Sequence, residues 1–211
     1  MVEHHAQLMD HTYKWQRHFY DATRKHYLFG RDRMLRDLRL EPRGSVLEIG
    51  CGTGRNLALV RRHWSDAKLF GLDISVEMLK SARANLGLQA TLALGDAATF
   101  DSRHLFGRER FDRIVLSYCL SMIPAWEETV THACGMLRPG GSLHIVDFGD
   151  MSGIPLPLRR PLLVWLEKFH VTPRLALVGH AKMVSAGFGV TGEARNGPCG
   201  YYQQIVLRRP T

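Results

Sequence analysis

The sequence predicts an α/β protein with a mostly parallel seven-stranded sheet, helices on both faces and an antiparallel C-terminal edge. Three observations lead to this prediction. From Ser45 onward, short apolar stretches typical of buried strands alternate with stretches of helical periodicity. The first strand runs directly into the glycine cluster GCGTG at 50–54. The last two apolar stretches are joined by a short connection, which predicts a closing hairpin.

The individual elements follow in chain order. Residues 1–44 read as one or two helices, because Gly and Pro are absent before Gly30 and apolar residues recur at helical spacing. We expect strands at 45–49, 68–74, 90–97, 111–120, 142–149, 189–195 and 201–209. Helices are expected at 55–64, 75–87 and 126–137, with a turn at RPGG (138–141), a short helix at 162–169 and a helix end near 182–185.

The length predicts one domain, since chains of about 100–200 residues usually fold around a single core. Within the domain 1–211 we expect a helical lid at 1–44, a ligand-binding core at 45–150, and a basic excursion with the C-terminal hairpin at 151–211. Neither a membrane-spanning apolar run of about 20 residues nor an apolar secretory signal is found. These features predict a cytoplasmic protein. The four cysteines have no paired spacing of a zinc or redox site, so no metal is expected.

Positive charge is concentrated at both flanks of the core. Residues 46–150 carry 11 Lys and Arg against 12 Asp and Glu, whereas 1–45 carry 9 against 6 and 151–211 carry 8 against 2. Such a distribution favours an anionic partner, such as lipid headgroups or nucleic acid, although a merely solvated basic surface would have the same composition.

The loop VLEIGCGTGRN carries the main chemical signal. Its glycines allow the backbone to approach a ligand closely before a helix begins. A dinucleotide-binding loop needs a third glycine at the position of Arg55, so that function loses support. Glu48, two residues before Gly50, suits an ammonium group and would repel a pyrophosphate.

Together with GLDIS, LGDAATF, FDRIVLSYCL and LRPGGSLHIVDF, this loop resembles the motifs of the class I S-adenosylmethionine-dependent methyltransferases, over residues 46–150. The resemblance implies a Rossmann-like fold with S-adenosylmethionine as cofactor. It implies that Asp73 takes the ribose hydroxyls, that Met78 flanks the adenine, and that Asp96 receives the adenine amino group. The full set of cofactor-binding residues so implied is Tyr20, Glu48, Gly50, Cys51, Gly52, Gly54, Asp73, Ile74, Met78, Asp96, Ala97 and Ser117.

The N-terminal run YKWQRHFYDATRKHYLFGRDRML resembles the leading segment of bacterial phospholipid N-methyltransferases, and most closely the diacylglyceryl-homoserine N-methyltransferases of betaine-lipid synthesis. The resemblance implies trimethylation of a lipid amine. An amine must arrive unprotonated, so a hydroxyl that accepts a proton would assist. The candidate catalytic residues are Tyr13, Tyr20 and Tyr118, with packing of the leading helix as the other reading of each. Arg24, Lys25 and Arg31 are candidate partners of an acceptor carboxylate.

A lipid acceptor agrees with the basic flanks. The segment LPLRRPLLVWLEKFH (156–170) mixes Arg and Lys with Leu, Trp and Phe, which is typical of an interfacial helix, and peripheral binding at the inner face of the cell membrane is expected. The segment fits equally a helix that caps the sheet. Phosphatidylethanolamine is the alternative acceptor, and a small molecule is a further one. A nucleic-acid methyltransferase is disfavoured because LSYCLSMIPAW replaces an Asn-Pro-Pro-Tyr-type motif. A non-enzymatic lipid- or cofactor-binding module is the alternative from another class.

Overall fold

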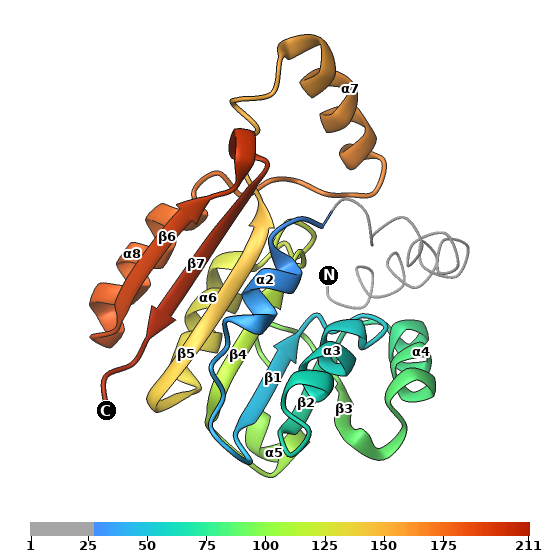
Figure 1. The fold of residues 1–211 in the computed structure, drawn as a ribbon, viewed down its shortest axis with the longest axis vertical. Helices are drawn as coiled ribbons and strands as arrows, with labels where there is room; N and C mark the ends of the chain where they lie inside the picture. Colours follow the sequence, from blue (N-terminus) through green and yellow to red (C-terminus); the bar gives the residue numbers. More distant parts are fainter. Residues whose placement is uncertain (1–27) are drawn as a thin grey trace.

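The protein is built on a seven-stranded mixed sheet, as seen in a computed structural model that describes residues 28–211 (Figure 1). The strands lie in the order β3-β2-β1-β4-β5-β7-β6. Strands β1 to β5 are parallel, and β7 is antiparallel to both β5 and β6. Their bounds are β1 Ser45–Ile49, β2 Lys68–Asp73, β3 Ala90–Leu94, β4 Phe111–Ser117, β5 Leu137–Phe148, β6 Thr191–Asn196 and β7 Tyr202–Arg208. The predicted mixed sheet with an antiparallel C-terminal edge is confirmed.

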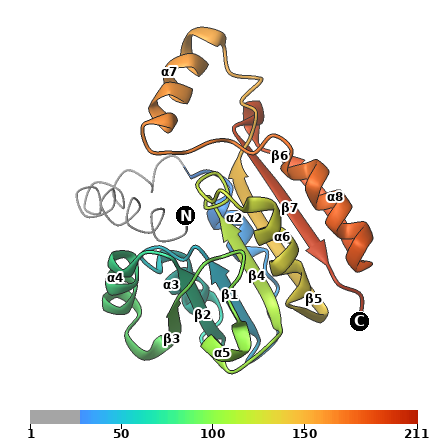
Figure 2. The same ribbon diagram turned by 180° about the vertical axis from the view of Figure 1, so that it is seen from behind.

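The helices cover both faces of this sheet (Figures 1 and 2). One apolar core lies between the sheet and α2, α3 and α4, and the other lies between the sheet and α5, α6 and α8. The bounds are α2 Arg31–Arg36, α3 Arg55–His63, α4 Val76–Leu86, α5 Ser102–Phe106, α6 Trp126–Gly135, α7 Leu156–Glu167 and α8 Leu177–Phe188.

The alternation of side chains along β1 determines which residues face each side of the sheet. All five residues of β1 are buried, as expected for a strand covered on both sides. Because side chains alternate along a strand, Leu47 and Ile49 enter the core beneath α6 and α8, whereas Val46 enters the core beneath α2 and α3. Glu48 has the same parity as Val46. Its carboxylate is therefore directed to the face that α2 and α3 cover.

Helix α7 stands away from the sheet at the edge where the parallel strands end (Figure 2). It begins at Leu156, six residues before the predicted start at Leu162. The prediction was wrong because Pro157 lies in the first turn, where a missing N–H costs nothing, and because the helix continues through Pro161. Among residues 28–211 no helix has the length and apolarity to cross a membrane.

The predicted turn at RPGG is also different in the structure. These residues lie inside β5, where pairing with β4 shifts from Phe111 opposite Leu137 to Arg113 opposite Ser142. The extra residues form an irregularity in the strand, with Gly140 at φ 72°. Strand β5 therefore begins five residues before the predicted start at Ser142.

Candidate functional site

The glycine loop after β1 forms the floor of the site at the carboxyl ends of the parallel strands, the position where open α/β sheets bind ligands. Gly50, Gly52 and Gly54 have φ values of 72°, 54° and 76°. A Cβ on Gly50 would lie 2.7 Å from Cys119 Cβ, and a Cβ on Gly54 would lie 2.6 Å from Leu86 Cδ1. Among residues 28–211, no atom would lie within 4 Å of a Cβ on Gly52. Packing therefore explains the outer two glycines, while the middle one borders space that this part of the chain leaves open to a ligand.

Asp73, the last residue of β2, ties this loop to the next helix. Its Oδ2 accepts a hydrogen bond from the Gly52 amide at 2.7 Å, and its Oδ1 accepts one from the Ser75 amide at 2.9 Å. The Ser75 hydroxyl in turn caps α4 by accepting from the Met78 amide at 3.3 Å. Asp73 is 9% exposed. The two backbone amides fix the orientation of its carboxylate beside Gly52.

Glu48 is the most unusual charged group of the site. It is 1% exposed, and its Oε1 accepts a hydrogen bond from Asn56 Nδ2 at 2.7 Å. Within the described part of the chain, its Oε2 has no hydrogen-bond partner although it is buried. Burial raises the pKa of Glu48 to about 8, against the lowering effects of Asn56 and of the Arg31 charge. A buried acceptor without a donor is costly in an isolated protein, so this oxygen is suited to a cationic ligand.

Asp96 lies at the carboxyl end of β3, beside Asp73. The amide of Gly95 donates to the Asp73 carbonyl at 3.1 Å, and Asp96 Oδ1 accepts from the Ala98 amide at 2.8 Å. The next residue, Ala97, is partly buried against the core beneath α6. The structure thus brings the two predicted acids to the ends of neighbouring strands.

The other predicted cofactor contacts border the same loop. Cys51 is buried, which raises the pKa of its thiol well above the usual range, and its amide donates to Leu72 O at 2.9 Å. Ile74 is half-buried immediately after Asp73. Ser117 ends β4 and is half-buried, and its hydroxyl has no hydrogen-bond partner among residues 28–211.

Met78 in the first turn of α4 is 3% exposed. It packs against Met122, from the connection between β4 and α6, and against Phe169, which follows α7. Three segments distant in sequence therefore meet over the place that the resemblance gives to the adenine.

Tyr118 has a structural contact that the sequence did not reveal. The residue has φ 53° and is 1% exposed, and its hydroxyl donates to the Phe29 carbonyl at 2.6 Å. Burial raises the pKa of the hydroxyl above its ordinary value. In this arrangement Tyr118 fastens the segment before α2 to the sheet. The other two candidate catalytic residues, Tyr13 and Tyr20, lie outside the described residues, as do Arg24 and Lys25.

Two polar groups of the site, half-buried Asn56 and buried Asp147, were missed by the sequence reasoning. Asn56, in the first turn of α3, holds Glu48; its place two residues after the glycine loop was the available signal. Asp147, near the end of β5, accepts from the Ser121 amide at 3.1 Å and the Phe148 amide at 2.8 Å. Burial raises the pKa of Asp147 to about 6. The described residues contain no cluster of His, Cys, Asp and Glu that would hold a metal ion.

Comparison with known proteins identifies the family. A family model described as "Methyltransferase domain" matches residues 46–141. The chain is 31% identical over 157 residues to a phosphatidylethanolamine N-methyltransferase of Cereibacter sphaeroides, a match covering 68% of this chain and 76% of the relative. The chain belongs to the class I S-adenosylmethionine-dependent methyltransferases.

Other relatives match a smaller share of this methyltransferase. A trans-aconitate 2-methyltransferase of Methylobacterium radiotolerans is 35% identical over 53% of this chain, and a malonyl-[acyl-carrier protein] O-methyltransferase of Herminiimonas arsenicoxydans is 34% identical over 53%. The matches span 41% and 44% of those two proteins, so the chain covers less than half of their length.

Solved structures confirm the Rossmann-like fold. The plantazolicin methyltransferase BamL, solved with S-adenosylhomocysteine, has a TM-score of 0.72 at 15% identity, with 100% of this chain and 98% of BamL covered. A Haemonchus contortus phosphoethanolamine N-methyltransferase 2, solved with S-adenosyl-L-methionine, has a TM-score of 0.68 at 14% identity and covers 86% of this chain and 52% of that one.

The residues of the methyltransferase fit its cofactor, S-adenosylmethionine. The Glu48 oxygen that lacks a hydrogen-bond partner within residues 28–211 suits the ammonium of the methionine end, and the space at Gly52 admits a ligand against the backbone. Asp73 would hold the ribose, and Asp96 with Met78 the adenine. When bound, the cofactor supplies an electrophilic methyl group on a sulfonium.

Proposed function

We propose that this methyltransferase methylates the amine headgroup of a membrane lipid, with diacylglyceryl-homoserine as the acceptor. The observation that carries the proposal is the match to the C. sphaeroides phosphatidylethanolamine N-methyltransferase. Its 157 residues exceed the 46–141 span of the general methyltransferase domain, so similarity extends beyond the cofactor-binding part. The N-terminal run at 13–35 and the basic C-terminal part favour the homoserine lipid. The name of the relative favours phosphatidylethanolamine as the second candidate acceptor.

The chemistry requires alignment of the amine with the methyl group and exclusion of water, with no metal. Phe169 and Met122 over Met78 contribute to excluding water on the adenine side. Tyr20 and Tyr13, from the segment preceding the described residues, are the proposed groups near the amine. Their aromatic faces would also tolerate the cationic product, at about 0.5–2 kcal/mol per contact.

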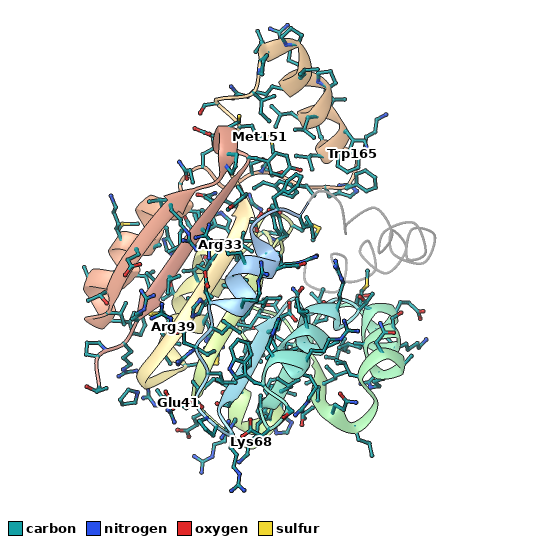
Figure 3. All side chains as sticks on the ribbon, viewed as in Figure 1. Arg33, Arg39, Glu41, Lys68, Met151 and Trp165 are labelled. Atoms are coloured by element: carbon teal, nitrogen blue, oxygen red, sulfur yellow. The ribbon has the colours of Figure 1, made fainter. Side chains whose placement is uncertain are left out.

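The exposed face of α7 supports a membrane partner. Leu156, Arg160, Val164 and Lys168 recur at every fourth residue, so they share one side of the helix. Leu156 and Val164 are 56% and 55% exposed. On the other side of α7, Leu166 is buried and Trp165 lies at the end of the helix nearer the sheet (Figure 3). An apolar and cationic row of this kind suits anionic headgroups.

A bilayer bound to α7 would lie close to the cofactor site. Phe169, one residue beyond Lys168, packs on Met78 in the first turn of α4, and the Asp73 carboxylate binds the N-cap residue of that helix, Ser75. We therefore propose that α7 lies on the inner face of the cell membrane while the cofactor cleft stays next to the headgroup layer.

Lipid mass spectrometry tests the acceptor. The purified protein is incubated with S-adenosylmethionine and vesicles containing either diacylglyceryl-homoserine or phosphatidylethanolamine, and methylated lipid is quantified, with a Tyr20→Phe variant in parallel. We expect successive methylation of the homoserine lipid, and we expect the variant to lose more in turnover than in cofactor affinity. Methylation of phosphatidylethanolamine alone would establish the second candidate. Cofactor binding without methylation of either lipid would refute lipid N-methylation.

Vesicle flotation tests the membrane partner. Reversing charge at Arg160 and Lys168 to Glu should release the protein from anionic vesicles at low salt, because exposed charges attract headgroups within about 10 Å at 0.1 M salt. Lys182→Glu on α8 is the control, since this exposed lysine lies on a different helix of the fold. Equal release by the control, or retention of the α7 variant, would count against docking through α7.

A further inference from the structure

Three arginines line a cavity at the edge of the sheet opposite the cofactor loop. Helix α5 ends at Phe106, and Gly107, with φ 67°, turns the chain toward β4. The cavity has a volume of about 530 Å³ and is lined by Arg103, Gly107, Arg108, Glu109 and Arg110. Arg110 directly precedes the first residue of β4, so the cavity lies at the amino ends of the strands. It is therefore separate from the methyl-transfer site at their carboxyl ends.

The guanidinium of Arg108 rests on two aromatic rings. Its Cζ lies 5.2 Å from the centre of the Phe70 ring and 5.6 Å from that of Phe111, within the range of cation–π attraction. The two rings pack edge to face with their centres 5.4 Å apart. Arg108 Nη1 is buried and has no hydrogen-bond partner among residues 28–211. A buried donor without an acceptor is costly, so this side chain is suited to an anionic ligand.

The other two arginines of the cavity leave donors for a ligand. Arg110 Nη1 donates to the Leu137 carbonyl at 3.1 Å, which fixes the position of its guanidinium. Arg103 Nη1 lies 2.9 Å from Glu109 Oε1, and these two side chains are 77% and 63% exposed. Because exposed ion pairs contribute little to stability, Arg103 can turn to a ligand at small cost. With three positive charges and one negative charge, the lining has a net charge of +2.

We propose that this cavity binds a soluble phosphate monoester through Arg103, Arg108 and Arg110. A phosphoryl group carries a charge of about −1.5 to −2 at neutral pH, which complements the lining. Arginine binds phosphate strongly because its planar fork can donate two parallel hydrogen bonds to phosphate oxygens. The volume falls in the range of small-molecule sites, about 300–1,000 Å³, so the cavity has room for the organic part of the ligand beside the phosphate.

The position of the cavity favours a soluble ligand over a phospholipid headgroup. Helix α7 lies at one end of the molecule and α5 at the other (Figures 1 and 2). A bilayer bound to α7 would therefore lie away from the cavity. This choice of source rests on the proposed docking of α7, but the phosphate site does not. Residues 46–150 carry 11 Lys and Arg against 12 Asp and Glu, and three of those arginines fall within 103–110, so general basicity does not explain the cluster.

Calorimetry on the full chain saturated with S-adenosylhomocysteine tests the site, because the bound product keeps the probes out of the cofactor cleft. Glucose 6-phosphate should bind, and glucose should not. Arg103→Gln and Arg108→Gln should each weaken glucose 6-phosphate binding about 10- to 100-fold, as expected when a charged hydrogen bond is lost, and Arg108→Lys should recover part of that loss. Arg83→Gln is the matched control, since it removes the same charge from an exposed position on α4.

Three other outcomes would overturn the assignment. One is that glucose 6-phosphate does not bind at millimolar concentration, or binds no better than glucose. Another is that Arg83→Gln weakens binding as much as the cavity variants, which would leave only general charge attraction. The third is binding of dihexanoyl phosphatidic acid without binding of glucose 6-phosphate, which would assign the cavity to a lipid headgroup. The exposure of Arg103 keeps Arg103→Gln informative even where Arg108→Gln fails to fold. No lipid amine is used, so this proposal and lipid methylation fail separately.

Discussion

Protonation of Glu48 should control cofactor affinity near neutral pH. Burial raises the pKa of this carboxyl to about 8, so at pH 6 only about one free protein in a hundred has it ionised. A ligand ammonium favours the ionised form of Glu48, so binding requires that the Glu48 carboxyl lose its proton. Deprotonation reduces the binding free energy by about 3 kcal/mol at pH 6, and this cost disappears above pH 8. Affinity for S-adenosylhomocysteine should therefore rise about 50-fold from pH 6 to pH 8.

Calorimetry in buffers of different ionisation enthalpy measures both the affinity and the protons released. Near pH 6.5 we expect almost one proton released per ligand bound. Glu48→Gln should bind more weakly at pH 8 and show little dependence on pH. Glu109→Gln is the control, because Glu109 has a 63% exposed side chain on the far loop before β4. Wild-type affinity that stays constant from pH 6 to pH 8, without proton release, would refute the role assigned to Glu48.

Three further predictions concern the loop and its supports. Among the described residues, a Cβ on Gly52 or on Gly87 meets no atom, and the two glycines have φ 54° and 55°. Gly52→Ala and Gly87→Ala should therefore each cost about 1–2 kcal/mol of unfolding free energy, but only Gly52→Ala should weaken S-adenosylhomocysteine binding, by about tenfold. Equal affinities of the two variants would show that no ligand approaches Gly52. Tyr118→Phe should cost about 1 kcal/mol in urea unfolding, because the Phe29 carbonyl loses its donor; an unchanged midpoint would contradict that bond. Burial raises the folded-state pKa of Asp147 from 3.8 to about 6, so the unliganded fold should lose about 2 kcal/mol of stability as pH rises from 4 to 7. Asp147→Asn should remove that slope in unfolding curves, and a slope retained in the variant would place its origin elsewhere.

The cofactor loop was predictable because its chemistry is local in sequence. Gly50 to Gly54 follow one strand and Asp73 ends the next, and parallel strands bring their carboxyl ends to the same edge. The spacing of the glycines in the sequence does not show why two of them are needed. Gly54 makes room for Leu86 and Gly50 for Cys119, so two of the three glycines are explained by packing between distant segments.

The features that sequence reasoning did not supply depend on tertiary contacts. Tyr118 directly follows β4, which ends at Ser117 and so three residues before its predicted end, and the direction of the Tyr118 hydroxyl follows from a left-handed backbone and from a carbonyl 89 residues away. The burial of Arg31 likewise depends on how α2 packs on the sheet. The early start of α7 was missed because prolines that normally end helices lie here in the first turns. Tyr13 and Tyr20 remain predictions.

The position of β7 affects the order in which the sheet can form on the ribosome. Strand β6 is synthesised first, yet all its residues are exposed and its backbone pairs with β7. The growing chain must therefore wait for residues 202–208 before β6 can attach, while β5 presents an open edge. A nascent chain arrested between these strands would offer that edge to other chains, so aggregation during synthesis should concentrate in this short interval.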